Sequence, residues 1–157
     1  MYFNRKCKIT FICHGATIYS EEGRISEAEN YPPLSELGVE EMEALTKYLK
    51  SRAIKNDVIY TSPAVRTRQS AMMISKLFKK DYVVVDDLTS RRLGQWNGMT
   101  VGQILEKYPD GIQDLLLHPN KNADSVVEAS DEFVARIKAV IDRLVEENVG
   151  NRSIIVT

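Results

Sequence analysis

Four short runs along the chain are rich in β-branched and aromatic residues: Lys8–Cys13, Val58–Thr61, Tyr82–Val85 and Ser153–Thr157. Runs of this kind are typical of strands. In the stretches between them, apolar residues recur every three or four positions, which predicts helices at about 36–52, 63–77, 101–108 and 126–147. Strands that alternate with helices predict an α/β fold, a mostly parallel sheet with helices on both faces.

Polar residues and prolines mark where these helices begin. Ser35 precedes an apolar helical face formed by Leu37, Met42, Leu45 and Leu49, and is predicted to be the N-cap. Pro63 suits the first turn of the second helix, and Thr100 is a cap for the third. A short helix is expected before His118, followed by a linker over 120–124. Ligands of such folds bind beyond the carboxyl ends of the strands, so the residues after Cys13, Tyr60 and Thr157 are the candidates for a site.

Composition restricts the class of protein. A chain of 157 residues with 43% hydrophobic and 27% charged residues fits one globular domain, 1–157. The 21 basic and 22 acidic residues give a net charge of -1, which favours neither a nucleic-acid nor a membrane partner. No apolar run approaches the roughly 20 residues that span a bilayer, and no signal peptide is recognised. Cys7 and Cys13 would lie about 20 Å apart on one strand, so free thiols and a cytoplasmic location are expected.

Four ordered segments carry the chemistry. They are the loop Cys13–Thr17, the helix start Pro33–Gly38, the strand-to-helix segment Tyr60–Ala71 and the loop Leu88–Thr100. Together they resemble the histidine phosphatase (phosphoglycerate mutase-like) superfamily, whose opening motif reads Arg-His-Gly-Glu-Thr and whose second-strand motif reads Ser-Ser-Pro-x-x-Arg-x-x-Gln-Thr-Ala. The resemblance implies that His14 is the phosphoryl acceptor and that Arg66 and Thr17 bind the substrate phosphate.

The residue types suit these roles. A neutral imidazole attacks phosphorus when its other ring nitrogen donates to an acceptor that fixes the tautomer. An arginine fork donates two parallel hydrogen bonds to phosphate oxygens. The alternatives are an ordinary loop histidine for His14 and a solvated helical arginine for Arg66. If the roles hold, the two side chains should meet at the carboxyl edge of adjacent strands.

Other matches are structural. Trp96 is expected to anchor its loop by packing. Residues 123–125 stand where the family tends to have Gly-Glu-Ser, and the final strand matches the one that precedes the family's second catalytic histidine.

Three family features are missing. Cys13 replaces the phosphate-binding arginine, which by analogy with a lost oxyanion donor could cost about 10²- to 10³-fold in rate. Ser90 replaces the acid that protonates the leaving group, a function worth roughly 10²- to 10⁴-fold. Asp86 or Asp87 could supply that proton or could be solvated loop residues. The second histidine would follow Thr157, so the domain is expected to lack its C-terminal part, and His118 is expected to be a surface residue.

Two functions remain open at this point. The first is a phosphatase that transfers a phosphoryl group through a phosphohistidine, with a small phosphorylated metabolite or phosphohistidine as substrate. The second is a catalytically impaired relative that binds a phosphate ligand or a protein. No cofactor is implied, and no metal either, because no His, Cys or acidic cluster has the spacing of metal ligands. The sequence does not indicate an oligomeric state.

Overall fold

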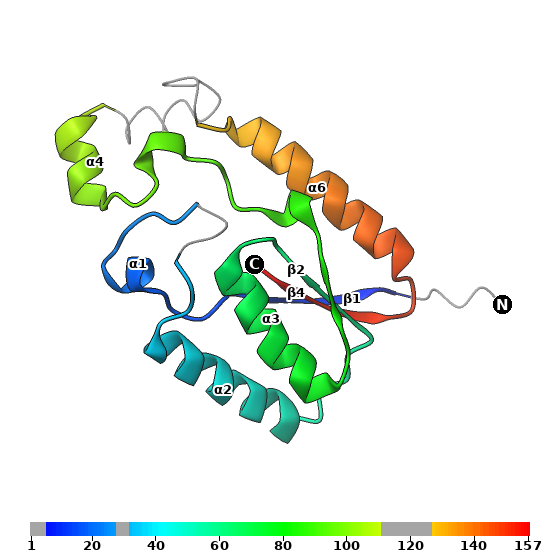
Figure 1. Cartoon of the computed structure of the whole chain (residues 1–157). Coiled ribbons are helices and arrows are strands. Elements are labelled where there is room, and N and C mark those ends of the chain that lie inside the picture. Colours follow the sequence, from blue (N-terminus) through cyan, green and yellow to red (C-terminus); the bar gives the residue numbers. More distant parts are fainter. Residues whose placement is uncertain (1–5, 28–31, 111–126) are drawn as a thin grey trace.

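The computed structural model describes residues 6–27, 32–110 and 127–157. The strands are β1 (Lys8–Ile12), β2 (Val58–Thr61), β3 (Tyr82–Val84) and β4 (Arg152–Val156). The helices are α1 (Ile18–Glu21), α2 (Glu36–Ser51), α3 (Val65–Phe78), α4 (Val101–Lys107) and α6 (Ser130–Glu147), with 3₁₀ turns η1 (Asp86–Leu88) and η2 (Gly94–Trp96). These strands form a parallel sheet in the order β1-β4-β2-β3 (Figure 1). The predicted α/β fold with a parallel sheet is confirmed.

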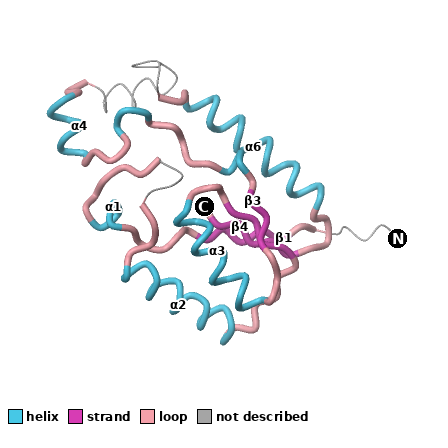
Figure 2. The backbone as a smooth tube through the Cα atoms, in the orientation of Figure 1, coloured by secondary structure: helices cyan, strands magenta, loops and turns pink. Residues whose placement is uncertain are grey.

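Helices cover both faces of the sheet. The helices α2 and α3 lie on one side and α6 lies on the other, as the two ribbon views show (Figures 1 and 2). The strand β4 explains why both faces are covered. Successive side chains of a strand point to opposite faces of the sheet. Ile154 and Val156 belong to the core beneath α2 and α3, whereas Ile155 belongs to the core beneath α6. A strand that is apolar on both faces has to be covered on both.

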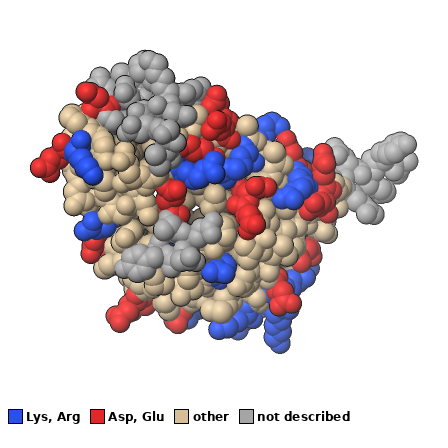
Figure 3. All heavy atoms as spheres, turned by 45° about the horizontal axis from the view of Figure 1, so that its top comes forward, with Lys and Arg blue, Asp and Glu red and all other residues tan. Residues whose placement is uncertain are grey.

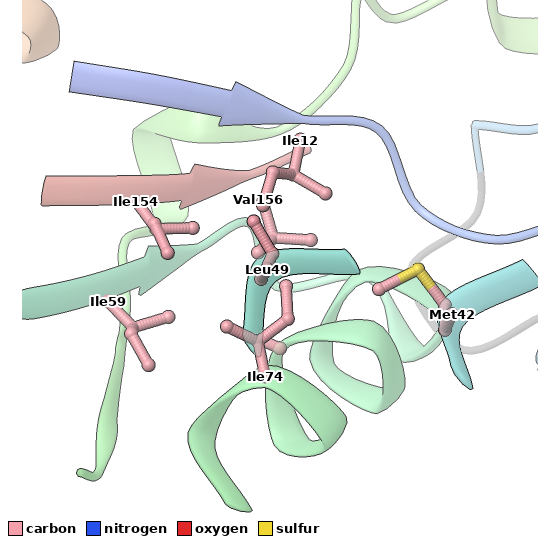
Figure 4. Packing of buried hydrophobic residues seen from close by; sticks show 8 residues of the cluster. Ile12, Met42, Leu49, Ile59, Ile74, Ile154 and Val156 are labelled. Carbon is pink, nitrogen blue, oxygen red and sulfur yellow. The ribbon is translucent and has the colours of Figure 1, made fainter. Parts of the chain in front are cut away.

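The larger core lies between the sheet and the pair α2 and α3. Ile59, Ile74 and Ile154 are almost fully buried there, and Figure 4 shows them packed together. Burying one such side chain contributes about 1.5–3 kcal/mol. Met42 and Leu49 of α2 complete this core, but Leu37 is 47% exposed. The predicted apolar face of α2 is therefore correct except at its first residue, which lies in the solvated first turn.

The helices α2 and α4 start at the predicted capping residues. The Ser35 hydroxyl accepts a hydrogen bond from the Gly38 N–H, and Thr100 forms a capping box with Gln103. The long C-terminal helix begins at Ser130 rather than at 126, because Ala129 has extended backbone angles. The sequence analysis predicts no helix at the position of the short helix α1. The predictions for a short helix before His118, for the linker, for residues 123–125 and for His118 itself lie outside the described residues.

Two glycines let the loop after β1 lie directly against the start of α2. A Cβ on Gly15 would stand 2.3 Å from the Gly38 carbonyl oxygen, and a Cβ on Gly38 would stand 2.0 Å from the Ala16 carbonyl oxygen. Both distances are far inside van der Waals contact with backbone atoms. Any side chain at either position would therefore push the loop and the helix apart.

We expect Gly38→Ala to lower the free energy of unfolding by about 1–3 kcal/mol, the usual cost of overpacking. Urea denaturation measures this change. Gly102→Ala is the matched control, because its Cβ would meet nothing nearer than 3.8 Å and alanine favours a helix. Equal stability of Gly38→Ala and the control would contradict the close approach of the two backbones.

Candidate active site

His14 stands at the carboxyl end of β1 as the first residue of a tightly held loop. Its backbone N–H donates to the Thr157 carbonyl oxygen at 3.1 Å, which ties it to the end of β4. Its Nδ1 lies 2.7 Å from the Gly15 carbonyl oxygen. Because a carbonyl only accepts, Nδ1 carries the hydrogen and Nε2 carries the lone pair. The half-buried imidazole is thus held in the tautomer whose Nε2 can act as a nucleophile.

Arg66 lies in the first turn of α3 and brings its guanidinium to this imidazole. The Arg66 Nε–H donates to His14 Nε2 at 3.2 Å, and Nη2 donates to the Ser26 carbonyl oxygen at 3.2 Å. The residue is only 4% exposed. The predicted meeting of His14 and Arg66 is confirmed. The prediction that they follow adjacent strands is wrong, because β4 lies between β1 and β2 and the long arginine side chain spans its width.

The surroundings lower the pKa of His14 below its usual value of about 6.5. Burial is the largest cause, since it disfavours the charged imidazolium, and the positive charge of Arg66 acts in the same direction. The hydrogen bond to Gly15 and the negative charge of Glu41 act against these two effects without reversing them. At neutral pH the ring is therefore mostly neutral, as a nucleophile has to be.

One face of α3 holds the loop after β1 near both of its ends. Three residues after Arg66, the Gln69 side-chain oxygen accepts the Leu34 N–H at 2.8 Å. One residue further, the buried Ser70 hydroxyl accepts the Gly15 N–H at 3.2 Å. Side chains three and four positions apart share a helix face, so these contacts form together when α3 docks.

The remaining residues expected in the site have different surroundings. Thr17 is fully buried and caps α1, exchanging hydrogen bonds with Ser20, and its role in phosphate binding stays a prediction. Cys13 is exposed and free. Burial lowers the pKa of the Arg66 guanidinium, and Cys13 raises that pKa by a smaller amount.

Ser90 is half-buried on a loop that a buried ion pair holds. The Glu128 carboxylate, whose side chain is 1% exposed, accepts two hydrogen bonds from Arg136, at 2.9 and 2.8 Å. Arg136 also donates to the carbonyl oxygens of Asp87 and Thr89, at 2.7 and 3.0 Å. The pair therefore attaches the residues before Ser90 to the start of α6.

The same loop is held from its other side by the segment after α1. The Glu27 carboxylate accepts the N–H groups of Leu93 and Gly94, at 2.7 and 2.6 Å. Backbone bonds between Ile25 and residues 98 and 99 extend this contact. Because Ser26 binds Arg66 through its carbonyl, the loop that carries Ser90 and the guanidinium share one support.

Asp86 and Asp87 are exposed in η1 and line a cavity of about 340 Å³ with Tyr60 and Arg143, on the α6 side of the sheet. The structure gives neither of them a contact with His14. Trp96 is 4% exposed and packs near Tyr108, with ring centroids 6.4 Å apart, as expected of an anchor. Within the described residues, no three His, Cys, Asp or Glu side chains are grouped so that they could hold a metal ion.

Sequence reasoning missed several residues of the site. Ser70 could have been found from its helical spacing to Arg66. Glu41, whose carboxylate accepts the Ala16 N–H at 2.8 Å, and the pair Glu128 and Arg136 depend on contacts between distant segments. Nothing local in the sequence indicates them. No helix in the described ranges is long and apolar enough to cross a membrane.

Comparisons with known proteins agree with this fold. The sequence profile of the histidine phosphatase superfamily (branch 1) matches residues 9–157. Phosphoserine phosphatase 1 of Hydrogenobacter thermophilus is 26% identical over 149 residues, which are 95% of this chain and 69% of that protein. A broad-specificity phosphatase of Saccharomyces cerevisiae is 28% identical over 147 residues, 92% of this chain and 60% of that protein. The crystal structure of phosphoglycerate mutase from Bacillus anthracis superposes with a TM-score of 0.81 at 22% identity, covering 95% of this chain and 73% of that one.

A histidine whose Nε2 carries the lone pair thus lies beside a buried arginine at the carboxyl edge of a parallel sheet. The chain belongs to the histidine phosphatase superfamily, branch 1, as the match over residues 9–157 shows. Relatives that it matches are phosphatases by name.

The tautomer and pKa of His14 are directly measurable by NMR. In a pH titration of the histidine side chains, the His14 signals should titrate below about pH 6.5, with the hydrogen on Nδ1 above the midpoint. Loss of one set of signals in His14→Gln assigns the residue. A hydrogen on Nε2 at neutral pH, or a midpoint above 6.5, would show that the site does not favour a neutral nucleophile.

The buried pair that supports the Ser90 loop should affect stability in a pH-dependent way. Burial favours the neutral carboxyl, but the hydrogen bonds from Arg136 and Arg92 and their charges outweigh it and lower the pKa of Glu128. Because the pKa of Glu128 is lower in the folded protein, its carboxylate stabilises the fold fully at pH values above the pKa of the unfolded chain, about 4.3. This stabilisation is lost as the pH falls through the pKa of the folded protein.

Glu128→Gln should therefore lose about 2 kcal/mol of unfolding free energy at pH 7, and the loss should shrink toward acid pH. Urea denaturation between pH 7 and pH 3 measures both effects. Glu146→Gln, at an exposed position of α6, should change stability by less than about 0.5 kcal/mol. A pH-independent difference for Glu128→Gln would mean that the charge of Glu128 does not stabilise the loop.

Proposed function

We propose that the protein is a phosphatase in which His14 Nε2 accepts the phosphoryl group and Arg66 binds its oxygens. One observation supports this most strongly: Nδ1 of His14 donates to the Gly15 carbonyl while the Arg66 Nε–H points at Nε2. A phosphate that approaches Nε2 meets the guanidinium at the same place. Electrostatic donors that are fixed before the reaction are the main source of stabilisation in such transfers.

The reaction would proceed in two steps. The Nε2 lone pair forms a bond to phosphorus while the bond from phosphorus to the leaving oxygen breaks, and that oxygen leaves with the electron pair. The Arg66 Nε–H keeps its hydrogen but would exchange its acceptor, from His14 Nε2 to a phosphoryl oxygen, which leaves the Nε2 lone pair available for the attack. In the second step water attacks the phosphohistidine and restores the free imidazole with inorganic phosphate. The Gly15 carbonyl stabilises the positive charge that the ring acquires, because Nδ1–H stays hydrogen-bonded.

The substrate we propose is a small phosphorylated metabolite or a phosphohistidine. With Ser90 in place of the family's acid, leaving groups that depart without a proton are favoured, and phosphohistidine is one of them. On the face shown in Figure 3, basic and acidic side chains are interspersed, which supports a small-molecule partner better than a nucleic acid. A cytoplasmic location, free thiols included, fits the same proposal.

The second candidate is a binding protein that has lost turnover. The observation in its favour is that Cys13 has a thiol where the family has a phosphate-binding arginine. Arg66 contacts His14, but the guanidinium that the family has at position 13 is missing. Anion binding without hydrolysis would then be the function.

A series of phenyl phosphates with leaving groups of different acidity separates the two candidates. Because general acid catalysis contributes roughly 10²- to 10⁴-fold only when the leaving oxygen is basic, turnover should fall steeply as the leaving-group pKa rises. Ser90→Glu should flatten this dependence by raising the rates of the poor leaving groups. His14→Ala should abolish turnover of the whole series.

Each other outcome has a definite meaning. A flat dependence in the unaltered protein would show that another acid protonates the leaving group. Tight vanadate binding without turnover of any ester would reject the phosphatase and support the binding protein.

The thiol at position 13 gives a further prediction. Cys13→Arg should bind vanadate about tenfold more tightly or better, since a charge-assisted hydrogen bond is worth about 1.5–3 kcal/mol. Cys13→Lys should gain less, because a lysine lacks the planar fork. Fluorescence or calorimetric titration of both variants measures the difference. Equal or weaker binding by the arginine variant would show that position 13 does not contribute to the anion pocket.

A further inference from the structure

A second cavity lies at the opposite end of the sheet from His14. Its volume is about 430 Å³, and its walls are the first residues of β1 and β4, the end of α2 and the loop from α2 to β2. Figure 1 shows that β1 and β4 both start at this end of the sheet and run toward the C-terminus. From Lys8 to His14 the strand covers roughly 20 Å, so one small ligand cannot touch both places. We call this hollow the amino-edge cavity.

The amino-edge cavity is positively charged. Lys8, Lys55 and Arg152 line it, and no acidic residue does. In the part of the chain that the structure describes, none of these three side chains forms an ion pair. The Asp57 carboxylate, which accepts the Arg152 backbone N–H at 2.8 Å, lies close by and adds one negative charge. The carboxyl end of α2 adds about half a negative charge more, and the three positive charges outweigh the two together.

The wall of the amino-edge cavity also contains an amide with unused hydrogen-bonding capacity. Asn56 is 6% exposed, and neither its side-chain nitrogen nor its side-chain oxygen has a hydrogen-bond partner within the described residues. Buried polar groups without partners are rare, because each one costs free energy. An asparagine amide offers one donor side and one acceptor side, which together match the donor–acceptor edge of a base such as adenine.

The rest of the lining is apolar and preformed. Leu49, Ile54 and Ile154 supply apolar surface, and Tyr48 adds an aromatic ring. The Ile54 N–H donates to the Leu49 carbonyl at 3.1 Å, and the Lys8 N–H donates to the Asn151 carbonyl at 3.0 Å. These backbone bonds fix the loop and both strand starts, so little order has to be created when a ligand binds. The volume is within the range of small-ligand pockets, about 300–1,000 Å³.

We propose that the amino-edge cavity is a second binding site, separate from the catalytic one, for a small organic phosphate of mononucleotide size. Its phosphate lies among Lys8, Lys55 and Arg152, and its flat donor–acceptor part lies against the apolar wall and reaches Asn56. The phosphate dianion matches the positive charges of Lys8, Lys55 and Arg152, and the flat part explains why the wall is apolar.

NMR of the backbone amides of the full chain tests this proposal, with adenosine 5′-monophosphate as the probe. The amide signals of residues 8–10, 53–56 and 152–154 should shift as the probe is added and reach a plateau. Vanadate should compete with the probe only at His14, so it should reverse the shifts around His14 and leave those of the amino-edge cavity unchanged. Inorganic phosphate should bind the amino-edge cavity more weakly, and adenosine should not saturate it. Shifts confined to the surroundings of His14 would overturn the proposal, and equal affinity for inorganic phosphate would overturn the assignment of an organic ligand.

Variants of the exposed Lys55 and Arg152 locate the site without risk to folding. Lys55→Ala and Arg152→Ala should each weaken binding of the probe roughly fivefold, the effect of one charge near a surface. Lys76→Ala on α3 removes an equal charge elsewhere and should leave the affinity unchanged. Asn56→Leu should remove the preference for the nucleotide over inorganic phosphate. Equal weakening in Lys76→Ala would show that only the overall charge of the protein attracts the probe, and would contradict a defined site.

Discussion

The contact between the Arg66 guanidinium and the His14 imidazole requires that the start of α3 stand over the carboxyl edge of the sheet. Three sets of interactions bring it there. The parallel strands β1, β4 and β2 place the two chain segments at one edge, and the His14 N–H is bound to the end of β4. Along α3, Arg66, Gln69 and Ser70 then contact the loop from one helix face. The glycine pair at 15 and 38 lets that loop lie flat against α2.

The sequence predicts much of this because the relevant signals are local. Strand composition, the caps at Ser35 and Thr100 and the apolar periodicity each involve a few neighbouring residues, and the structure agrees with them. The spacing of His14 and Arg66 from their strands was enough to place both at the edge of the sheet. Strand order was not predictable in this way, since it depends on which strands pair, and β4 lies between β1 and β2.

The supports of the site were hidden from the sequence for a physical reason. Glu27 binds N–H groups 66 and 67 residues away, and Arg136 binds carbonyl groups 47 and 49 residues away. Backbone groups have no sequence signature, so a side chain that binds them looks like any exposed charge. The start of α6 was predicted about four residues too early. The apolar spacing of the helix extends toward the N-terminus beyond Ala129, where the backbone is extended.

The account as a whole depends on His14 Nε2 being the atom that receives the phosphoryl group. The most direct test is to mix the protein with excess phenyl phosphate, stop the reaction within milliseconds in alkali and locate the bound phosphate by mass spectrometry and ³¹P NMR. A phosphohistidine is stable in alkali and labile in acid. We expect up to one phosphate per chain, on Nε2 of His14. Turnover without a labelled histidine, or phosphate on any other residue, would contradict the account.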